Sequence, residues 1–300
     1  RAVKIIKPKA ILFVTLEISV FGVILSWFNK KIISLYLITG FGQFLFKKHI
    51  RNHFLYFIYK LLFLSSKRRN NSKFVFQNSE DMNIFIQKKL VTKENSVLIH
   101  GSGINIEQIK LHKRMIRKSP SFLFSSRLVK AKGVREFLQA TKTIKNTYPM
   151  VSINIAGKHD LHDSDRISNA LLNEIQNSSY INYFGEVSHD DMQCLYKKSD
   201  IFVLPSYGEG LPKAALEAAA TGMPLILSKT SGCFECIENE KNGIFVEMHS
   251  VNSIINAMDY FINMPNEVID MGINSRTLIE KKFSLKRISN LYKDLLCEIK

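Results

Sequence analysis

The chain has 300 residues, of which 46% are hydrophobic and 23% charged, a composition that excludes disordered and fibrous proteins. This length is long for one domain and comfortable for two. Four cysteines predict no disulfide framework, which fits a reducing compartment, and the apolar stretch near the start lacks the small-residue ending of a signal peptide.

Positive charge is concentrated in the first part of the chain. Residues 1–120 carry 22 Lys and Arg against 5 Asp and Glu, a net charge of +17, whereas residues 121–300 carry a net charge of −1. Such asymmetry predicts a polyanionic partner for the first part. The two candidates are nucleic acid and an anionic membrane.

The chain opens with a predicted β-α-β unit. Residues 10–15 are an apolar run of strand length, residues 18–28 are compatible with a helix, and residues 32–38 predict a second buried strand that ends on Thr39-Gly40-Phe41-Gly42. An alternative joins residues 10–28 into a membrane-spanning helix. That span is barely long enough, and Glu17 would lie within it at a cost of ~2.5 kcal/mol or more.

Residues 44–69 interleave aromatic and aliphatic residues with basic ones and contain no acid. A helix of this composition can lie in a membrane interface with its lysines toward lipid phosphates. A core helix with a solvated basic face is an equal alternative.

Two further strands are predicted at 74–77 and 96–100, with a helix over 79–90 between them. Gly101-Ser102-Gly103 then predicts a flexible turn. The polar, basic residues 105–120 are interpreted as a linker between two domains.

The remaining sequence alternates strands and helices. Strands are expected at 121–126, 151–156, 180–184, 201–204, 224–227 and 243–246. Helices are expected at 133–146, 165–176, 189–198, 212–221, 250–263, 266–282 and 284–299. Repeated β-α units predict a parallel, doubly wound sheet with helices on both faces, in which ligands bind at the carboxyl ends of the strands.

The most informative segment is residues 205–222, which follow a predicted strand, turn through glycines and open a helix at Pro212. The backbone amides of Gly210 and Leu211 are expected to face a ligand from the helix N-terminus, where partial positive charge favours anionic or polar oxygens.

This segment resembles the E-x7-E motif of glycosyltransferase family 4, with Glu209 and Glu217 as the two acids. The flanking Ser-Tyr-x-Glu-Gly-Leu-Pro and Glu-Ala-x-Ala-x-Gly-x-Pro sequences match as well. The resemblance implies that Glu209 and the amides of Gly210 and Leu211 hold the donor sugar, with Pro212 beside them, while Glu217 holds the ribose hydroxyls. The alternative is an ordinary strand–loop–helix corner with two surface acids.

A second match lies in residues 126–134, which also end a strand and open a helix. Arg127 offers a planar fork suited to phosphate, and Lys132 offers a mobile point charge. The family places Arg and Lys at these positions to neutralise the departing diphosphate. Without the E-x7-E segment, the two residues would be interpreted as a solvated charge pair.

Weaker matches concern the donor side. Gly157 ends a strand, although Lys158 and His159 stand where the family often has a further glycine. Gly185 and Val187 lie in a segment that resembles the loop that meets the nucleobase. The segment 231–235 resembles a Gly-Cys-Arg-Glu sequence with a phenylalanine in place of the arginine, a departure that bears on donor-sugar preference.

The first part of the chain resembles bacterial transferases that extend undecaprenyl-diphosphate-linked sugars. The resemblance lies in the segments 37–42, 76–81 and 101–105. Within them, cleft loops are expected at Thr39, Gly40, Gly101, Ser102 and Gly103. The anionic lipid acceptor of those enzymes agrees with the basic charge of this part.

No metal or other cofactor is expected. Cys233 and Cys236 have the spacing of half a zinc site, but no second pair lies near in sequence. Asp163-x-Asp165 is expected in a loop entering a helix rather than at a strand end, so it is a weak candidate for a metal motif.

The resemblance implies the GT-B fold, with two Rossmann-like doubly wound domains. Residues 1–118 are predicted to form the acceptor-side domain, basic and facing a membrane, and incomplete because the family's first strand and glycine loop would lie ahead of Arg1. Residues 119–300 are predicted to form the domain that binds the nucleotide-sugar donor, including the C-terminal helices.

The implied activity is that of a retaining hexosyl- or N-acetylhexosaminyltransferase. It would move a sugar from a UDP-sugar to an undecaprenyl-diphosphate-linked saccharide in O-antigen or capsule assembly, on the cytoplasmic leaflet of the plasma membrane and without nucleic acid. Two alternatives stay open. One is a catalytically incomplete glycosyltransferase-like fragment, and the other is a basic nucleic-acid-binding module, whose affinity would fall steeply with salt.

Overall fold

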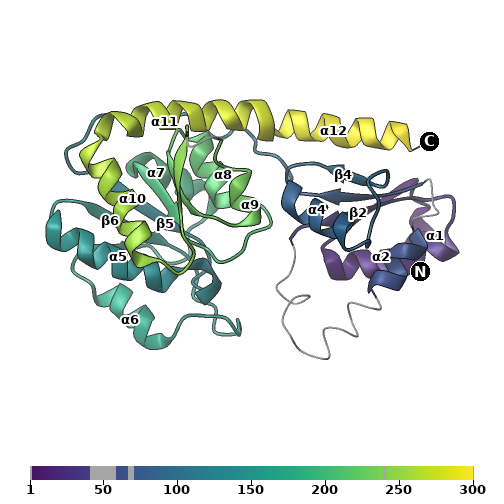
Figure 1. Cartoon of the computed structure of the whole chain (residues 1–300), viewed down its shortest axis with the longest axis horizontal. Coiled ribbons are helices and arrows are strands. Elements are labelled where there is room, and N and C mark those ends of the chain that lie inside the picture. Colours follow the sequence, from purple (N-terminus) through teal and green to yellow (C-terminus); the bar gives the residue numbers. More distant parts are fainter. Residues whose placement is uncertain (1, 41–58, 67–70, 239–240, 300) are drawn as a thin grey trace. The chain divides into compact units, whose positions relative to one another are not determined.

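A computed structural model describes residues 2–40, 59–66, 71–238 and 241–299 (Figure 1). The chain forms two compact units, with Arg1–Gly103 and Leu285–Lys300 in unit 1 and Ile104–Ser284 in unit 2. Each unit is built on a parallel sheet, as the alternation of strands and helices predicts. In the described part of the chain, no helix combines the length and hydropathy needed to cross a bilayer.

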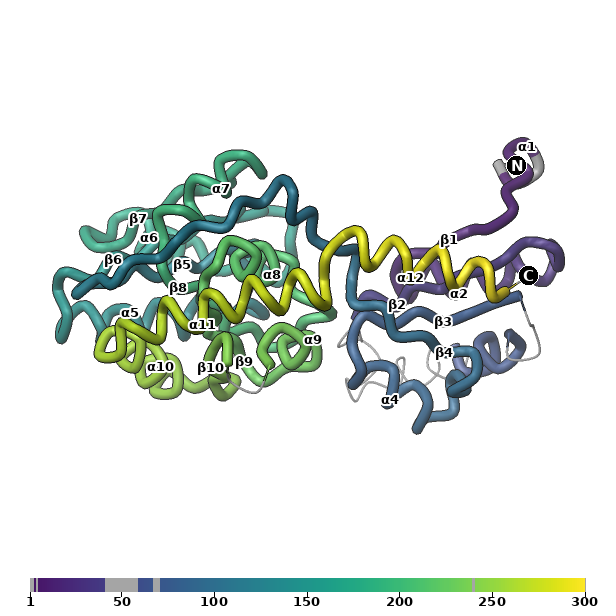
Figure 2. The backbone as a smooth tube through the Cα atoms, turned by 90° about the horizontal axis from the view of Figure 1, so that it is seen from above, coloured from purple at the N-terminus to yellow at the C-terminus, as the bar shows by residue number. Residues whose placement is uncertain are grey.

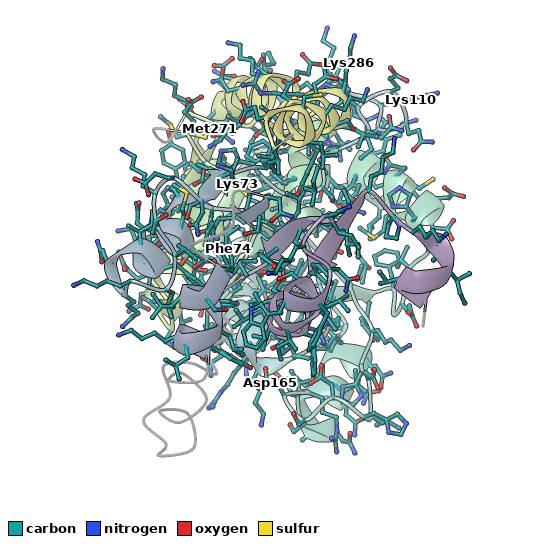
Figure 3. All side chains as sticks on the ribbon, turned by 90° about the vertical axis from the view of Figure 1, so that its right-hand side faces the viewer. Lys73, Phe74, Lys110, Asp165, Met271 and Lys286 are labelled. Atoms are coloured by element: carbon teal, nitrogen blue, oxygen red, sulfur yellow. The ribbon has the colours of Figure 1, made fainter. Side chains whose placement is uncertain are left out.

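Unit 1 contains a parallel sheet in the order β1-β2-β3-β4. Its elements are α1 (Ala2–Ile6), β1 (Ala10–Val14), α2 (Leu16–Phe28), β2 (Ile33–Ile38), β3 (Ser72–Phe76), α4 (Ser79–Gln87), β4 (Ser96–Leu98) and α12 (Leu285–Glu298). Side chains alternate between its two faces, so Tyr36 of β2 packs with α2 and α4, whereas Leu35 packs with α12. Lys73 and Phe74, labelled in Figure 3, are successive residues of β3, and Phe74 belongs to the first of these two clusters.

The C-terminal helix α12 covers the second face of the unit 1 sheet (Figures 1 and 2). Its buried residues Ile288 and Leu295 form one cluster with Leu37 and Val75 of the sheet. This differs from the predicted division, which placed all C-terminal helices in the second domain. The reason is physical: a two-faced parallel sheet needs apolar cover on both sides, and the apolar stripe of α12 supplies it.

Unit 2 contains a parallel sheet in the order β10-β9-β8-β5-β6-β7 (Figure 1). Its strands are β5 (Ser121–Ser125), β6 (Ser152–Ala156), β7 (Ile181–Tyr183), β8 (Ile201–Leu204), β9 (Leu225–Ser228) and β10 (Gly243–Val246). The chain begins at β5 in the middle, winds to β7 at one edge and returns to β8, so the strand order reverses between β5 and β8. Ligands of doubly wound sheets bind at this switch point, beyond the carboxyl ends of the strands.

Helices cover both faces of the unit 2 sheet. They are α5 (Val134–Thr147), α6 (Asn169–Asn177), α7 (His189–Lys198), α8 (Lys213–Ala220), α9 (Ser231–Phe234), α10 (Val251–Asn263) and α11 (Pro265–Leu278), with the 3₁₀ turn η2 (Lys130–Lys132) and the π-helical turn η3 (Ile279–Phe283). The side chains of Ser168, Ser188 and Ser250 each accept a backbone N–H at the start of α6, α7 and α10, which fixes where these helices begin.

Residues 104–120 belong to unit 2, and so the predicted boundary at 118/119 lies instead at 103/104. The buried Arg114 holds this segment by donating to the carbonyls of Tyr196 (2.9 Å), Ser199, Thr221 and Gly222 (both 3.2 Å). Burial lowers the pKa of Arg114 to about 10, so the guanidinium stays charged at neutral pH. The segment is therefore packed structure rather than a free linker.

The alternative of one membrane-spanning helix over 10–28 is wrong, because β1 and α2 occupy these residues and Thr15, with φ 82°, separates them. Of the basic segment 44–69, residues 59–66 are helical, and Phe63 within them is buried in the unit 1 core. The rest of that segment lies outside the described residues.

If α12 completes unit 1, Leu295→Ala lowers the free energy of unfolding by about 2–4 kcal/mol through the cavity it leaves. Chemical denaturation measures this loss, and hydrogen exchange is expected to rise in β2 and β3 but not in β5 and β8. Lys293→Ala, which alters an exposed position on α12, is the control. Faster exchange confined to unit 2 would contradict the assignment.

Candidate functional site

Two loops meet at the switch point of the unit 2 sheet. One follows β5 and ends at Gly133, and the other follows β8. The Tyr207 N–H donates to the Ala131 carbonyl at 2.8 Å. Gly133 has φ 70°, and a Cβ there would lie 2.1 Å from the Pro205 carbonyl oxygen. Only glycine permits this approach, which places the two predicted motifs side by side.

Lys132 and Glu209 form an ion pair across these loops. The Lys132 Nζ lies 2.6 Å from Glu209 Oε1, and the two side chains are 20% and 8% exposed. The predicted cation of one motif and the predicted first acid of the other are thus in direct contact. A pair this shielded from water holds both groups in place at the carboxyl edge of the sheet.

Arg127 lies on the same loop as Lys132, and its guanidinium pairs with Asp163, which the sequence did not predict as a partner. Its Nη1 donates to Asp163 Oδ2 at 2.7 Å, and the two side chains are 66% and 19% exposed. The exposed arginine therefore keeps N–H groups available for an anion.

Glu217 lies on α8 and is buried. Its Oε2 accepts a hydrogen bond from the Tyr196 hydroxyl at 3.3 Å, while its Oε1 lies 3.4 Å from Lys213 Nζ and 4.0 Å from His189 Nδ1. Burial, and then the nearby Glu217 carboxylate, raise the pKa of Tyr196 well above its usual value. The phenol therefore stays protonated and donates a hydrogen bond to the Glu217 carboxylate.

The glycine loop before α8 is shaped by contact with α9. The Gly232 N–H donates to the Glu209 carbonyl at 3.1 Å, and a Cβ on Gly232 would lie 2.4 Å from the Gly210 carbonyl oxygen. Leu211 packs partly buried against the unit 2 core. Pro212 is the N-cap, so α8 begins one residue later than predicted.

The weaker donor-side matches lie on the loops after β6 and β7. The Gly157 N–H donates to the Gly185 carbonyl at 2.7 Å, and a Cβ on Gly157 would lie 1.9 Å from the Ser126 carbonyl oxygen. Gly185 has φ 64° and open space around it, whereas Val187 packs partly buried against the core. Gly157 is thus required by packing, whatever it binds.

The predicted cleft residues of the first part belong to unit 1. Thr39 and Gly40 follow β2, and Gly101, Ser102 and Gly103 follow β4. Gly103 has φ 83°, and a Cβ there would lie 2.7 Å from the Cα of Leu285 at the start of α12. Packing accounts for Gly103, and a role of this set in a cleft stays a prediction.

Cys233 and Cys236 are both buried, and burial raises the pKa of Cys233 to about 12 and that of Cys236 well above its usual value. Both thiols therefore stay protonated at neutral pH, in which form they are poor metal ligands. Within residues 2–40, 59–66, 71–238 and 241–299, no cluster of three or more His, Cys, Asp or Glu side chains is arranged to hold a metal ion.

Sequence reasoning missed several residues of the site. They are His189, Tyr196 and Lys213. Asp163 and Asp165 were considered only as a weak metal motif, and Gly232 only as part of the segment 231–235. The i,i+4 spacing of Lys213 and Glu217 on one helix was a signal that could have identified that pair. His189 and Tyr196 lie on α7, a different helix from Glu217, so spacing along the chain gives no sign of their contact with it.

Comparison with known proteins assigns most of unit 2 to a family. The profile of the family described as Glycosyl transferases group 1 matches residues 106–278. A relative from Campylobacter jejuni, an N,N'-diacetylbacillosaminyl-diphospho-undecaprenol alpha-1,3-N-acetylgalactosaminyltransferase, is 28% identical over 247 residues, which cover 78% of this chain and 62% of the relative. An Escherichia coli UDP-Gal:alpha-D-GlcNAc-diphosphoundecaprenol alpha-1,3-galactosyltransferase is 35% identical over 115 residues, which cover 37% of this chain and 28% of the relative.

Solved structures agree on the fold. The HepE protein of Anabaena, determined with UDP and glucose, has a TM-score of 0.78 at 18% identity and covers 96% of this chain and 78% of its own. A glycosyltransferase from Rickettsia africae has a TM-score of 0.79 at 18% identity, covering 99% and 78%. These likenesses confirm the predicted GT-B fold. The chain spans less than two thirds of the length of either curated relative named above.

The contact between Gly232 and the Glu209–Gly210 backbone predicts a local effect of Gly232→Ala. The added methyl must displace backbone, so the free energy of unfolding falls by about 1–3 kcal/mol, and hydrogen exchange rises in the loop at 208–212. Ser231→Ala, on the same short helix, is the control. Unchanged exchange in that loop would show that α9 does not shape it.

Proposed function

Because the chain belongs to the Glycosyl transferases group 1 family, we propose that it transfers a sugar from a UDP-sugar to a lipid-diphosphate-linked saccharide. The observation that carries this proposal is the Lys132–Glu209 ion pair at the switch point of the unit 2 sheet, with Arg127 on the same loop. The UDP bound in the HepE structure supports the choice of nucleotide.

Each group has a defined task in the proposed reaction. Lys132 and Arg127 hold the diphosphate and stabilise the charge that develops on it as the bond to the anomeric carbon breaks. Glu209 orients the sugar, and Glu217, held by the Tyr196 hydroxyl, accepts hydrogen bonds from the ribose. Two fixed cations serve the leaving group here, so the proposal requires no metal.

We propose retention at the anomeric carbon. The acceptor hydroxyl oxygen forms its bond on the face from which the diphosphate leaves, and the hydroxyl proton passes to the departing phosphate oxygen. In that arrangement the leaving group itself takes the proton. No side chain of unit 2 is then needed as a separate base.

The acceptor proposal rests on relatives and on charge. The Campylobacter and Escherichia coli relatives are named for diphospho-undecaprenol acceptors, and another relative, CapM of Staphylococcus aureus, is named for capsular polysaccharide biosynthesis. The net charge of +17 in residues 1–120 suits a diphosphate lipid and an anionic leaflet. We therefore propose that the protein acts peripherally on the cytoplasmic face of the plasma membrane, in surface polysaccharide assembly.

Transfer from a panel of UDP-sugars to undecaprenyl-diphosphate-linked saccharides tests the proposal. We expect acceptor-dependent release of UDP, and a fall of about 10²–10³-fold in kcat for Lys132→Ala and for Glu209→Ala, because each removes fixed charge beside the reacting atoms. Lys142→Ala, which removes an exposed cation from α5, is the control and is expected to leave kcat unchanged.

Two results would count against the proposal. Equal kcat for Lys132→Ala and the unaltered protein would show that the Lys132–Glu209 ion pair has no role in the transfer reaction. Absence of transfer, together with salt-sensitive binding of DNA or RNA through the basic first part, would favour the nucleic-acid alternative instead.

A further inference from the structure

We infer that the loop after β6, residues 157–168, positions both cations of the proposed diphosphate site, with Asp163 acting on Arg127 and Asp165 acting on the turn that carries Lys132. The inference rests on the proposed function, and it adds two positioning residues that the motifs do not contain. Both act through another residue rather than on the substrate.

The loop is folded on itself. The Asp163 N–H donates to the Asp160 carbonyl at 3.2 Å, and the Arg166 N–H donates to the Asp163 carbonyl at 3.1 Å. The ring nitrogen Nε2 of His159, at the start of the loop, lies 3.0 Å from the carbonyl of Ile167 near its end. These bonds give the loop a fixed shape without help from a regular helix or strand.

Asp163 uses each carboxylate oxygen for a different task. Its Oδ1 accepts the Asp165 N–H at 2.9 Å, and its Oδ2 accepts from Arg127 Nη1 at 2.7 Å. The carboxylate therefore meets Arg127 with a set orientation. Among the described residues, Asp163 is the one acid within ion-pair distance of Arg127.

Asp165, labelled in Figure 3, fixes the short turn η2 that carries Lys132. Its Oδ2 accepts the Ala131 N–H at 2.9 Å, and its carbonyl accepts the Lys130 N–H at 2.8 Å. Val129 and Arg166 form an antiparallel bridge next to these bonds. Three consecutive residues of the turn region, 129–131, are therefore bonded to residues 165 and 166 of the loop, while the Lys132 side chain extends to Glu209.

Asp163 could favour or oppose a diphosphate. Its negative charge competes with the diphosphate for the Arg127 guanidinium. Its ion pair also orients the Arg127 side chain, which is two thirds exposed and would otherwise sample many rotamers. A partly exposed ion pair is weakened by water, so its competition with a doubly charged ligand is small. Orientation of the exposed arginine is the larger effect, because an ordered fork binds phosphate in a defined geometry.

The experiment compares the affinity for UDP with the affinity for uridine, measured by calorimetric titration and by ligand-observed NMR. Asp163→Ala is expected to weaken UDP binding about fivefold, the size of a partly exposed ion pair, and to leave uridine binding unchanged. Asp163→Asn keeps one acceptor oxygen, which can serve Arg127 or the Asp165 N–H but not both, so this variant is expected to recover only part of the lost UDP affinity.

Asp165 is tested in the same way. Asp165→Ala leaves the Ala131 N–H without its acceptor and is expected to weaken UDP binding by about tenfold, whereas Asp165→Asn restores it. Glu174→Ala, which removes an exposed carboxylate from α6, controls for net charge. A loss for UDP that uridine does not share separates positioning of the cations from general damage to the fold.

Three outcomes would overturn the inference. If Asp163→Ala bound UDP as tightly as the unaltered protein or more tightly, the carboxylate would be a competitor or a bystander. If UDP and uridine lost affinity equally, the loop would serve structure alone. If the unaltered protein bound no UDP, the proposed donor would be wrong, and the inference would fail with it.

Discussion

The ion pair between Lys132 and Glu209 depends on two loops whose backbones are in contact. Gly133 makes that contact possible, because its left-handed conformation and missing side chain let the chain turn against the Pro205 carbonyl. Gly232, which lies in α9, also approaches the Glu209–Gly210 backbone closely because it has no side chain. Close backbone packing therefore brings the charged side chains of Lys132 and Glu209 into contact, although they come from loops far apart in sequence.

The charged side chains of the site are arranged in pairs of opposite charge. Lys132 faces Glu209, Arg127 faces Asp163, and Lys213 lies near Glu217. Opposite charges held at these distances lower the cost of keeping ionised groups partly out of water. In the proposed reaction, a diphosphate would meet cations whose positions are already set by these partners, which is the condition for electrostatic stabilisation of a leaving group.

Much of the fold could be predicted from the sequence. The alternation of buried strands and helices after residue 120 predicts a doubly wound sheet, and the motif around Glu209 predicts which strand ends carry the site. The strand order, with β5 and β8 adjacent, explains why the two motifs meet. Their pairing thus follows from topology that local patterns only suggest.

Other features could not be predicted, because they depend on contacts between distant residues. The stripe of α12 is typical of any amphipathic helix, and nothing in its pattern indicates that it covers the sheet of unit 1. Arg114 lies in a basic, polar run, yet it is buried among four backbone carbonyls. Asp163 was considered as a metal motif, whereas the structure pairs it with Arg127.

The most direct test of the account is a crystal structure of the protein with UDP. We expect the diphosphate beyond the ends of β5 and β8, within hydrogen-bond distance of Lys132 and Arg127, with the ribose at Glu217. A nucleotide bound elsewhere on unit 2, or a diphosphate that contacts neither cation, would contradict the assignment of this site.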